Sequence, residues 1–150
     1  MQVTISINGR KHTRLIEPDM TLYSFVRACG CYSVKCGCET TNCGLCTVWM
    51  DGTPVLSCSV LAARAEGHEI TTLEGVLDEA KAFTDFLTAE GAEQCGFCSP
   101  GFIMNVLAMK HELTNPTEDE IRHYLSGNLC RCTGYMGQMR AIRNYMEVEA

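Results

Sequence analysis

The first residues of the chain alternate between apolar and polar side chains, and Asn8 and Gly9 follow them. An alternation with period two predicts a strand over residues 3–7. Asn-Gly is the pair preferred in a two-residue hairpin turn, so residues 10–16 are expected to return as a second strand beside the first. The pattern therefore predicts that the chain opens with a β-hairpin.

The same periodicity predicts the rest of the first half. Thr21 is placed to cap a helix whose apolar residues share one face. Residues 47–50 and 53–56 are two short strand patterns separated by Asp-Gly at positions 51–52, a second hairpin signal. Residues 70–73 read as a final strand. The first half is thus expected to be a small β-sheet crossed by one helix.

After Gly75 the period changes from that of strands to that of helices. Residues 77–87 predict a helix with Leu77 on its apolar face, and residues 102–113 predict a second, more uniformly apolar helix. A capping box that begins at Thr117 opens a third helix, and the last helix is expected from about residue 136 to 147. The second half is therefore predicted to be four helices.

Charge and composition narrow the possible functions. The net charge is −6, and there is no strongly basic patch, so nucleic acid is not an expected partner. No apolar run approaches the roughly 18 residues of a membrane span. Eleven cysteines are an odd number, and no export signal precedes them, which favours metal binding in a reducing compartment over a disulfide scaffold. The expected location is the cytoplasm.

The first cluster of thiols has a specific spacing. Cys38, Cys43 and Cys46 form a Cys-x4-Cys-x2-Cys pattern, and Cys58 follows on the strand expected to pair with the one after Cys46. This is the plant-type [2Fe–2S] ferredoxin spacing, and the surrounding sheet suits a ferredoxin-like β-grasp. The alternative is a structural zinc site, whose usual sign is two short Cys-x2-Cys pairs. The x4 gap argues against zinc here.

The second cluster of thiols lies in the helical half. Cys95 and Cys98 form one pair, and Cys130 and Cys132 form another. Both pairs fall on expected loops between helices. Four thiols could hold a second iron–sulfur cluster or a zinc ion, and their spacing alone leaves both readings open.

Two longer motifs extend these pairs. They are Gln-Cys-Gly-Phe-Cys-Ser-Pro-Gly at residues 94–101 and Gly-Asn-Leu-Cys-Arg-Cys-Thr-Gly-Tyr at residues 127–135. Downstream of the ferredoxin-type loop, they closely resemble the small iron–sulfur subunit of the xanthine dehydrogenase family of molybdenum hydroxylases. The resemblance covers essentially the whole chain. It implies an α+β fold, with a ferredoxin-like β-grasp over residues 1–75 followed by a four-helix bundle over residues 76–150.

The resemblance also implies roles for individual residues. Each half would hold one [2Fe–2S] cluster, and Gln94 and Cys132 would approach the pterin of a partner. No catalytic residue is expected on this chain. The implied cluster ligands are Cys38, Cys43, Cys46 and Cys58 in the first half and Cys95, Cys98, Cys130 and Cys132 in the second.

The implied function is electron transfer within an enzyme complex. A molybdopterin-binding large subunit would oxidise an N-heterocycle or an aldehyde, and an FAD-binding medium subunit would receive the electrons. The alternative is a free-standing ferredoxin-like carrier or iron–sulfur sensor, which would not need the helical half. The sequence does not name the substrate.

The chain also departs from the family's pattern. Glu39, Thr40 and Thr41 stand where the family usually carries Gly-Glu-Gly, so Glu39 or Thr41 is costly if its position needs a positive φ. Gln138 stands where an apolar residue is usual. Three further thiols have no ligand role in the family: Cys29, Cys31 and Cys36. They are interpreted as buried small hydrophobes, and the alternative is that they are surplus thiols tolerated in an organism that meets little oxygen.

Overall fold

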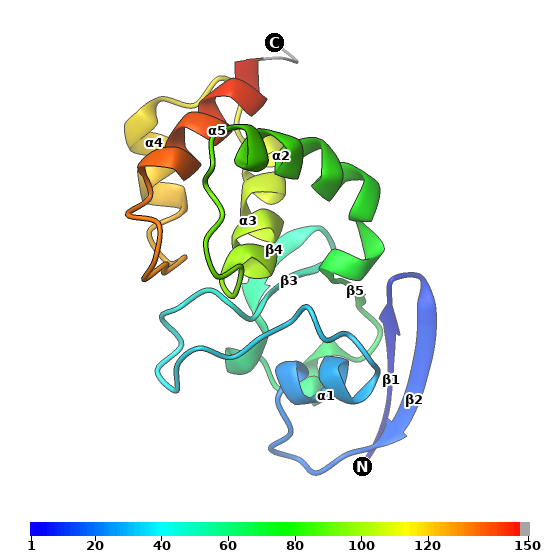
Figure 1. The fold of residues 1–150 in the computed structure, drawn as a ribbon. Helices are drawn as coiled ribbons and strands as arrows, with labels where there is room; N and C mark the ends of the chain where they lie inside the picture. The colour runs from blue at the N-terminus through cyan, green and yellow to red at the C-terminus, as the bar shows by residue number, and fades with distance from the viewer. Residues whose placement is uncertain (148–150) are drawn as a thin grey trace.

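The computed structural model describes residues 1–147, which form a mixed α+β fold (Figure 1). Within these residues there are five strands and five α-helices, and no helix is long and apolar enough to cross a membrane. The strands are β1 Gln2–Ile7, β2 Arg10–Leu15, β3 Thr47–Met50, β4 Thr53–Leu56 and β5 Glu69–Thr71. The helices are α1 Leu22–Ala28, α2 Leu77–Ala89, α3 Ser99–Glu112, α4 Glu118–Tyr124 and α5 Met136–Glu147.

The five strands form one sheet in the order β2-β1-β5-β3-β4. Both predicted hairpins are confirmed, because β1 pairs antiparallel with β2 and β3 with β4. The turn residues Asn8, Gly9, Asp51 and Gly52 all have φ between 51° and 83°, the left-handed conformation that a type I′ turn requires. The expected strand at 70–73 ends at Thr71, and a 3₁₀ turn begins at Leu73.

Helix α1 covers one side of this sheet. Thr21 caps it as predicted, since its hydroxyl accepts a hydrogen bond from Ser24 N at 3.2 Å. The predicted face, Leu22, Phe25 and Val26, is fully buried. These side chains join the inward residues of β1, β3 and β5 in the first hydrophobic core.

Helices α2 to α5 surround a second hydrophobic core. The buried face of α2 consists of Ala80, Phe83 and Leu87, whereas Leu77 is 62% exposed, so the prediction that Leu77 lies on that face was wrong. Leu77 is the first residue of α2, and the apolar stripe meets the neighbouring helices only from the next turn. Helix α3 starts at Ser99, three residues before the expected position, because Pro100 is compatible with the first turn of a helix.

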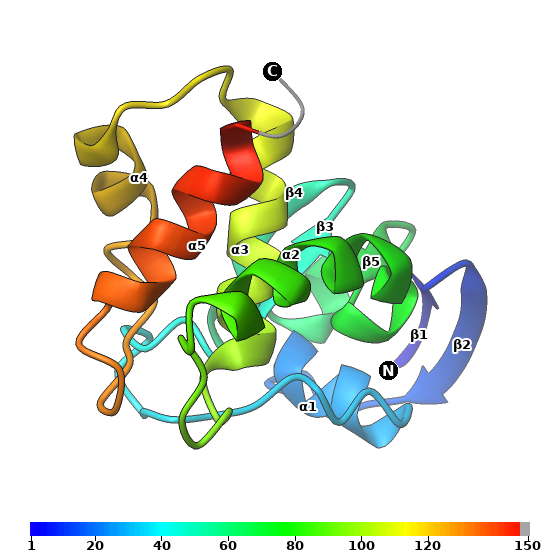
Figure 2. The same ribbon diagram turned by 45° about the horizontal axis from the view of Figure 1, so that its top comes forward.

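The two halves of the chain are in direct contact through strand β3 and helix α3. Trp49 of β3 belongs to the helical core, and its indole N–H donates to the carbonyl of Met104 in α3 at 2.9 Å. Below this contact, Gly101 of α3 packs against the backbone of Gly44, and a Cβ at position 101 would lie 2.3 Å from Gly44 O. The sheet end and the helical end of the molecule, seen in Figure 2, are therefore joined by backbone contacts as well as side chains.

Candidate iron–sulfur sites

The first candidate site lies on the long loop between α1 and β3. Glu74 anchors the start of this loop, because its carboxylate accepts hydrogen bonds from Ser33 N at 2.9 Å and Ser33 Oγ at 2.6 Å. The guanidinium of Arg27 donates to Val34 O at 2.7 Å. Lys35 N then donates to Leu45 O at 3.2 Å, which closes the loop on itself. These contacts fix the segment that carries the first thiols.

Four thiols gather on and beside this loop in two pairs. The β3–β4 register places Thr47 opposite Leu56, so Cys46 and Cys58 come together with their sulfurs 3.3 Å apart. Cys38 and Cys43 form the other pair through a side-chain hydrogen bond. The structure thus brings the four thiols of the first predicted set together as two pairs, and Cys38 is near enough to Cys58 to help raise its pKa.

The second candidate site joins two loops of the helical half. Gly96 has a φ of 71°, which lets the loop before α3 turn between Cys95 and Cys98. The sulfurs of Cys95 and Cys132 lie 3.6 Å apart, and Cys98 pairs with Cys130 through a side-chain hydrogen bond. The second predicted set is therefore also brought together as two pairs.

The grouping into pairs bears on which metal these thiols could hold. Within residues 1–147, no three His, Cys, Asp or Glu side chains converge as ligands of a single metal ion. A structural zinc ion needs four ligands around one point, whereas each iron of a [2Fe–2S] cluster takes two of the four thiolates. Two pairs of thiols at each site fit a binuclear cluster better than a zinc ion, a distinction that the spacing of Cys95, Cys98, Cys130 and Cys132 alone did not make.

Hydrogen bonds from the backbone lower the pKa of one thiol of the first set, and burial raises the pKa of another. The backbone N–H groups of Asn42, Thr40 and Cys43 lower the pKa of Cys38 to about 6, with Asn42 N 3.3 Å from its sulfur. Burial, followed by the adjacent Cys46, raises the pKa of Cys58 to about 12. Iron ligands must be thiolates, and the loop around Cys38 favours the thiolate form of this residue. N–H donors of this kind help to set the potential of a cluster.

In the second set the exposed pair, Cys95 and Cys132, also differs from the half-buried pair, Cys98 and Cys130. The backbone N–H of Phe97 lowers the pKa of Cys95, which is exposed. Burial, followed by Cys130, raises the pKa of Cys98 to about 12. Burial acts to raise the pKa of Cys130, but hydrogen bonds, first that from the Thr133 side chain and then those from the backbone of Cys132 and Thr133, together lower the pKa.

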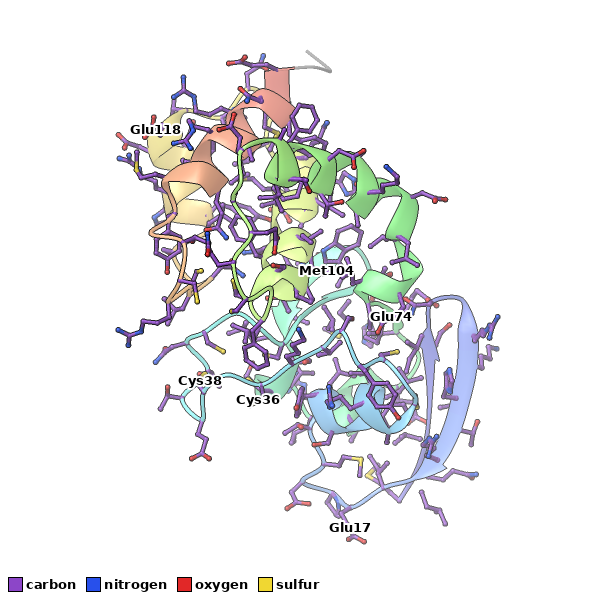
Figure 3. All side chains as sticks on the ribbon, in the orientation of Figure 1. Glu17, Cys36, Cys38, Glu74, Met104 and Glu118 are labelled. Carbon is purple, nitrogen blue, oxygen red and sulfur yellow. The ribbon has the colours of Figure 1, made fainter. Side chains whose placement is uncertain are left out.

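The two candidate sites are close neighbours. A cavity of about 480 Å³ is lined by Cys38 and Cys43 from the first set and by the four thiols of the second. The carbonyl of Cys43 accepts a hydrogen bond from Leu129 N at 2.9 Å, one residue before Cys130. Figure 3 shows Cys38 on the loop that runs under the helical half.

The residues expected to approach a pterin lie at the outer side of the second set. Gln94 is exposed, and so are its neighbour Cys95 and the paired Cys132. The structure places these three residues on the molecular surface, where another polypeptide can reach them.

The unusual segment at residues 39–41 is strained at one position. Thr41 has a φ of 57°, whereas neither Glu39 nor Thr40 has a positive φ. A β-branched residue in the left-handed region is unfavourable, because its Cβ crowds the backbone. The expected cost of this departure therefore falls on Thr41.

Replacing Thr41 by Gly should stabilise this loop. Relief of the left-handed strain outweighs the greater flexibility of Gly in the unfolded chain, for a gain of up to about 1 kcal/mol. We expect slower loss of visible absorbance when the cluster-loaded protein is incubated with an iron chelator. Thr40→Gly is the matched control and should accelerate that loss, because Thr40 has no positive φ. Equal behaviour of the two variants would contradict this account of the strain.

The three thiols without a family role occupy different surroundings. Cys31 is buried and Cys29 packs against the first core, as expected for small hydrophobes. Cys36 is exposed, and its thiol donates to Cys38 O at 3.0 Å, so the interpretation as a buried hydrophobe was wrong for Cys36 (Figure 3).

Comparison with known proteins agrees with this arrangement. Residues 72–143 match the family model described as a [2Fe-2S] binding domain. The chain is 41% identical over 149 residues to the nicotinate dehydrogenase small FeS subunit of Eubacterium barkeri, covering 97% of this chain and 94% of that protein. It is 46% identical over 140 residues to the xanthine dehydrogenase iron-sulfur-binding subunit of Escherichia coli O157:H7, covering 89% of this chain and 86% of that protein.

A solved structure shows the same fold. The crystal structure of quinoline 2-oxidoreductase from Pseudomonas putida 86 contains a chain that superposes with a TM-score of 0.89 at 39% identity. The match covers 99% of this chain and 94% of that chain. The extent of these matches shows the family, and with it the [2Fe–2S] cofactors and the electron-transfer role. The chain belongs to the family of small iron–sulfur subunits of the xanthine dehydrogenase-like molybdenum hydroxylases.

Proposed function

We propose that this chain relays single electrons from a molybdopterin site on a large partner subunit to FAD on a medium partner subunit. The observation that carries the proposal is the placement of the two thiol sets around one cavity, with one pair of the second set exposed at the surface. Bound [2Fe–2S] clusters would supply one-electron redox chemistry at the two sites. The protein holds the thiolates, directs N–H donors at them and keeps the sites close together.

The proposed ligands divide between the two halves of the chain. We assign residues 1–75 to a ferredoxin-like domain and residues 76–150 to a helical domain arranged as a four-helix bundle. The two hydrophobic cores support this division, although Trp49 crosses it. The proposed ligands are Cys38, Cys43, Cys46 and Cys58 in the first domain and Cys95, Cys98, Cys130 and Cys132 in the second.

We place the molybdopterin-binding partner against the exposed edge of the second set. Several large apolar side chains are exposed on the segments that carry these thiols, and exposed apolar patches are typical of interfaces. Gln94 and Cys132 are accessible there and are the proposed pterin contacts. The exposed apolar residues are Phe97 (48%), Leu129 (50%), Tyr135 (38%) and Met136 (63%).

The reaction class follows from the relatives rather than from this chain. The names of the similar proteins include nicotinate, xanthine and quinoline, which are all N-heterocycles. We therefore propose that the complex hydroxylates an N-heterocycle, with aldehydes as the second choice. The proposed location is the cytoplasm, where eleven free thiols would stay reduced.

The metal content of the purified complex tests the proposal. Eight ligands at four per cluster give two clusters, so four irons and four labile sulfides are expected for each copy of the chain. Reduced protein should show two distinct EPR signals, and molybdopterin and FAD should copurify. Stoichiometric zinc without labile sulfide would refute the cluster assignment. A stable monomer in native extracts, free of both other cofactors, would instead favour a free-standing ferredoxin-like carrier.

A further inference from the structure

The hydroxyl of Thr133 lies at the centre of a small polar cluster beside Cys130. Its oxygen is 3.1 Å from the sulfur of Cys130, 3.1 Å from the side-chain oxygen assigned to Gln138, and 3.2 Å from Tyr135 N. Gln138 comes from the first turns of α5 and is only 3% exposed. A polar side chain this deeply buried requires a hydrogen-bond partner, and Thr133 provides one.

The hydroxyl has one proton and two lone pairs to share among these three neighbours. Tyr135 N–H occupies one lone pair. If Gln138 presents its oxygen, the hydroxyl proton must point at Gln138 and leaves the sulfur of Cys130 without this donor. If Gln138 presents its NH₂ group, it fills the second lone pair, and the hydroxyl proton is directed at Cys130. The two orientations of an amide are interchangeable in shape and are distinguished by such networks.

The charge on the sulfur decides between the two orientations. An iron ligand is a thiolate, and a hydrogen bond to an ionised acceptor is about twice as strong as one between neutral groups. The NH₂ orientation makes three hydrogen bonds around the hydroxyl, one of them to the thiolate, whereas the other orientation makes two neutral ones. The NH₂ orientation is therefore favoured whenever Cys130 is a ligand.

We propose that Gln138 is a positioning residue that holds the Thr133 hydroxyl proton on the sulfur of Cys130 and thereby raises the reduction potential of the cluster at this site. The proposal rests on the assignment of Cys130 as a ligand in the preceding section. A donor to a ligand sulfur favours the more negative, reduced state, so it raises the potential. Gln138 does not contact the sulfur itself and acts through Thr133. Its NH₂ group donates to the second lone pair of the Thr133 hydroxyl, which stops the hydroxyl from rotating and polarises its O–H bond.

The test is a redox titration followed by EPR on the purified complex. Thr133→Val removes the donor to Cys130 and should lower the equilibrium constant for reduction of that cluster by about tenfold, which is about 59 mV for one electron. Gln138→Leu is close in size, removes the amide from the cluster and should lower the same potential by a smaller amount. The potential of the other cluster should stay unchanged in both variants. Gln138→Met provides a second apolar variant that adapts more easily to the site if Leu disturbs folding.

The double variant separates this mechanism from a general effect of packing. In the Thr133→Val background, Gln138→Leu should have no further effect, because the hydroxyl that Gln138 orients is gone. An equal shift from Gln138→Leu in both backgrounds would overturn the proposal. So would the absence of any shift when Gln138→Leu is made in the protein that retains Thr133. The absence of a second [2Fe–2S] signal in the unmodified protein would instead refute the ligand assignment, so the two failures are distinguishable.

Discussion

The Cys43→Ala variant is expected to lose the cluster of the first site, to retain that of the second site, and to stop electron flow to FAD almost completely. Cys43 pairs with Cys38, and removing one thiolate leaves an iron without its full ligand set. Rapid-freeze EPR after mixing the complex with substrate should show the second-site signal appearing at its usual rate. The flavin absorbance should then bleach far more slowly than in the unmodified complex.

Cys36→Ala is the matched control for this experiment. Cys36 lies on the same loop and is also a cysteine, but its thiol is exposed and donates to a backbone carbonyl, that of Cys38, at 3.0 Å. Both EPR signals and the rate of flavin reduction should survive in this variant. If Cys36→Ala loses the first-site signal, Cys36 is a ligand in place of Cys38. If flavin reduction persists in Cys43→Ala, the first site lies off the electron path.

The Gly101→Ala variant is expected to be strongly destabilising although it leaves every thiol in place. The added methyl group would lie 2.3 Å from Gly44 O and 2.9 Å from the Cα of Leu45, both of them backbone atoms. Backbone cannot swing aside like the end of a side chain, so α3 and the first thiol loop must separate. We expect a loss of about 3 kcal/mol in unfolding free energy, at the upper end of typical overpacking. Because Gly44 adjoins Cys43, iron should be lost from the first site as well.

Gly127→Ala provides the comparison for that variant. A Cβ at Gly127 would meet no atom within 4 Å, so its stability should stay within about 0.5 kcal/mol of the unmodified protein. Thermal unfolding and iron content measure both effects. Similar stabilities for the two variants would show that the contact between α3 and Gly44 is not the constraint described above.

Periodicity and turn chemistry predicted most of the fold from the sequence. The two hairpins were predictable because Asn8 and Asp51 precede glycines, and both pairs adopt the left-handed φ values that such turns demand. Helix α4 was predictable from its capping box, in which Thr117 N donates to the carboxylate of Glu120 at 2.7 Å. These signals are local, so a single sequence contains them.

Contacts between distant segments were not predictable in the same way. The grouping of the thiols into pairs depends on how the loop before α3 meets the loop before α5, which no periodicity encodes. The sequence flagged Gln138 as unusual but gave no partner for it, because the bond to Thr133 depends on the turn between Thr133 and α5. The exposure of Cys36 was not predicted for a similar reason, because the sequence of a loop does not indicate whether a side chain points inward or outward.

The position of Trp49 has a consequence for how this protein can be divided. Trp49 lies on strand β3 in the first half of the chain, yet its ring is buried among the helices and its N–H donates to Met104 O. A fragment that ended near Gly75 would expose this ring and leave the indole donor to water. We therefore expect the two halves to unfold together, and a recombinant that exchanges one half between relatives should also need the matching residues around Trp49.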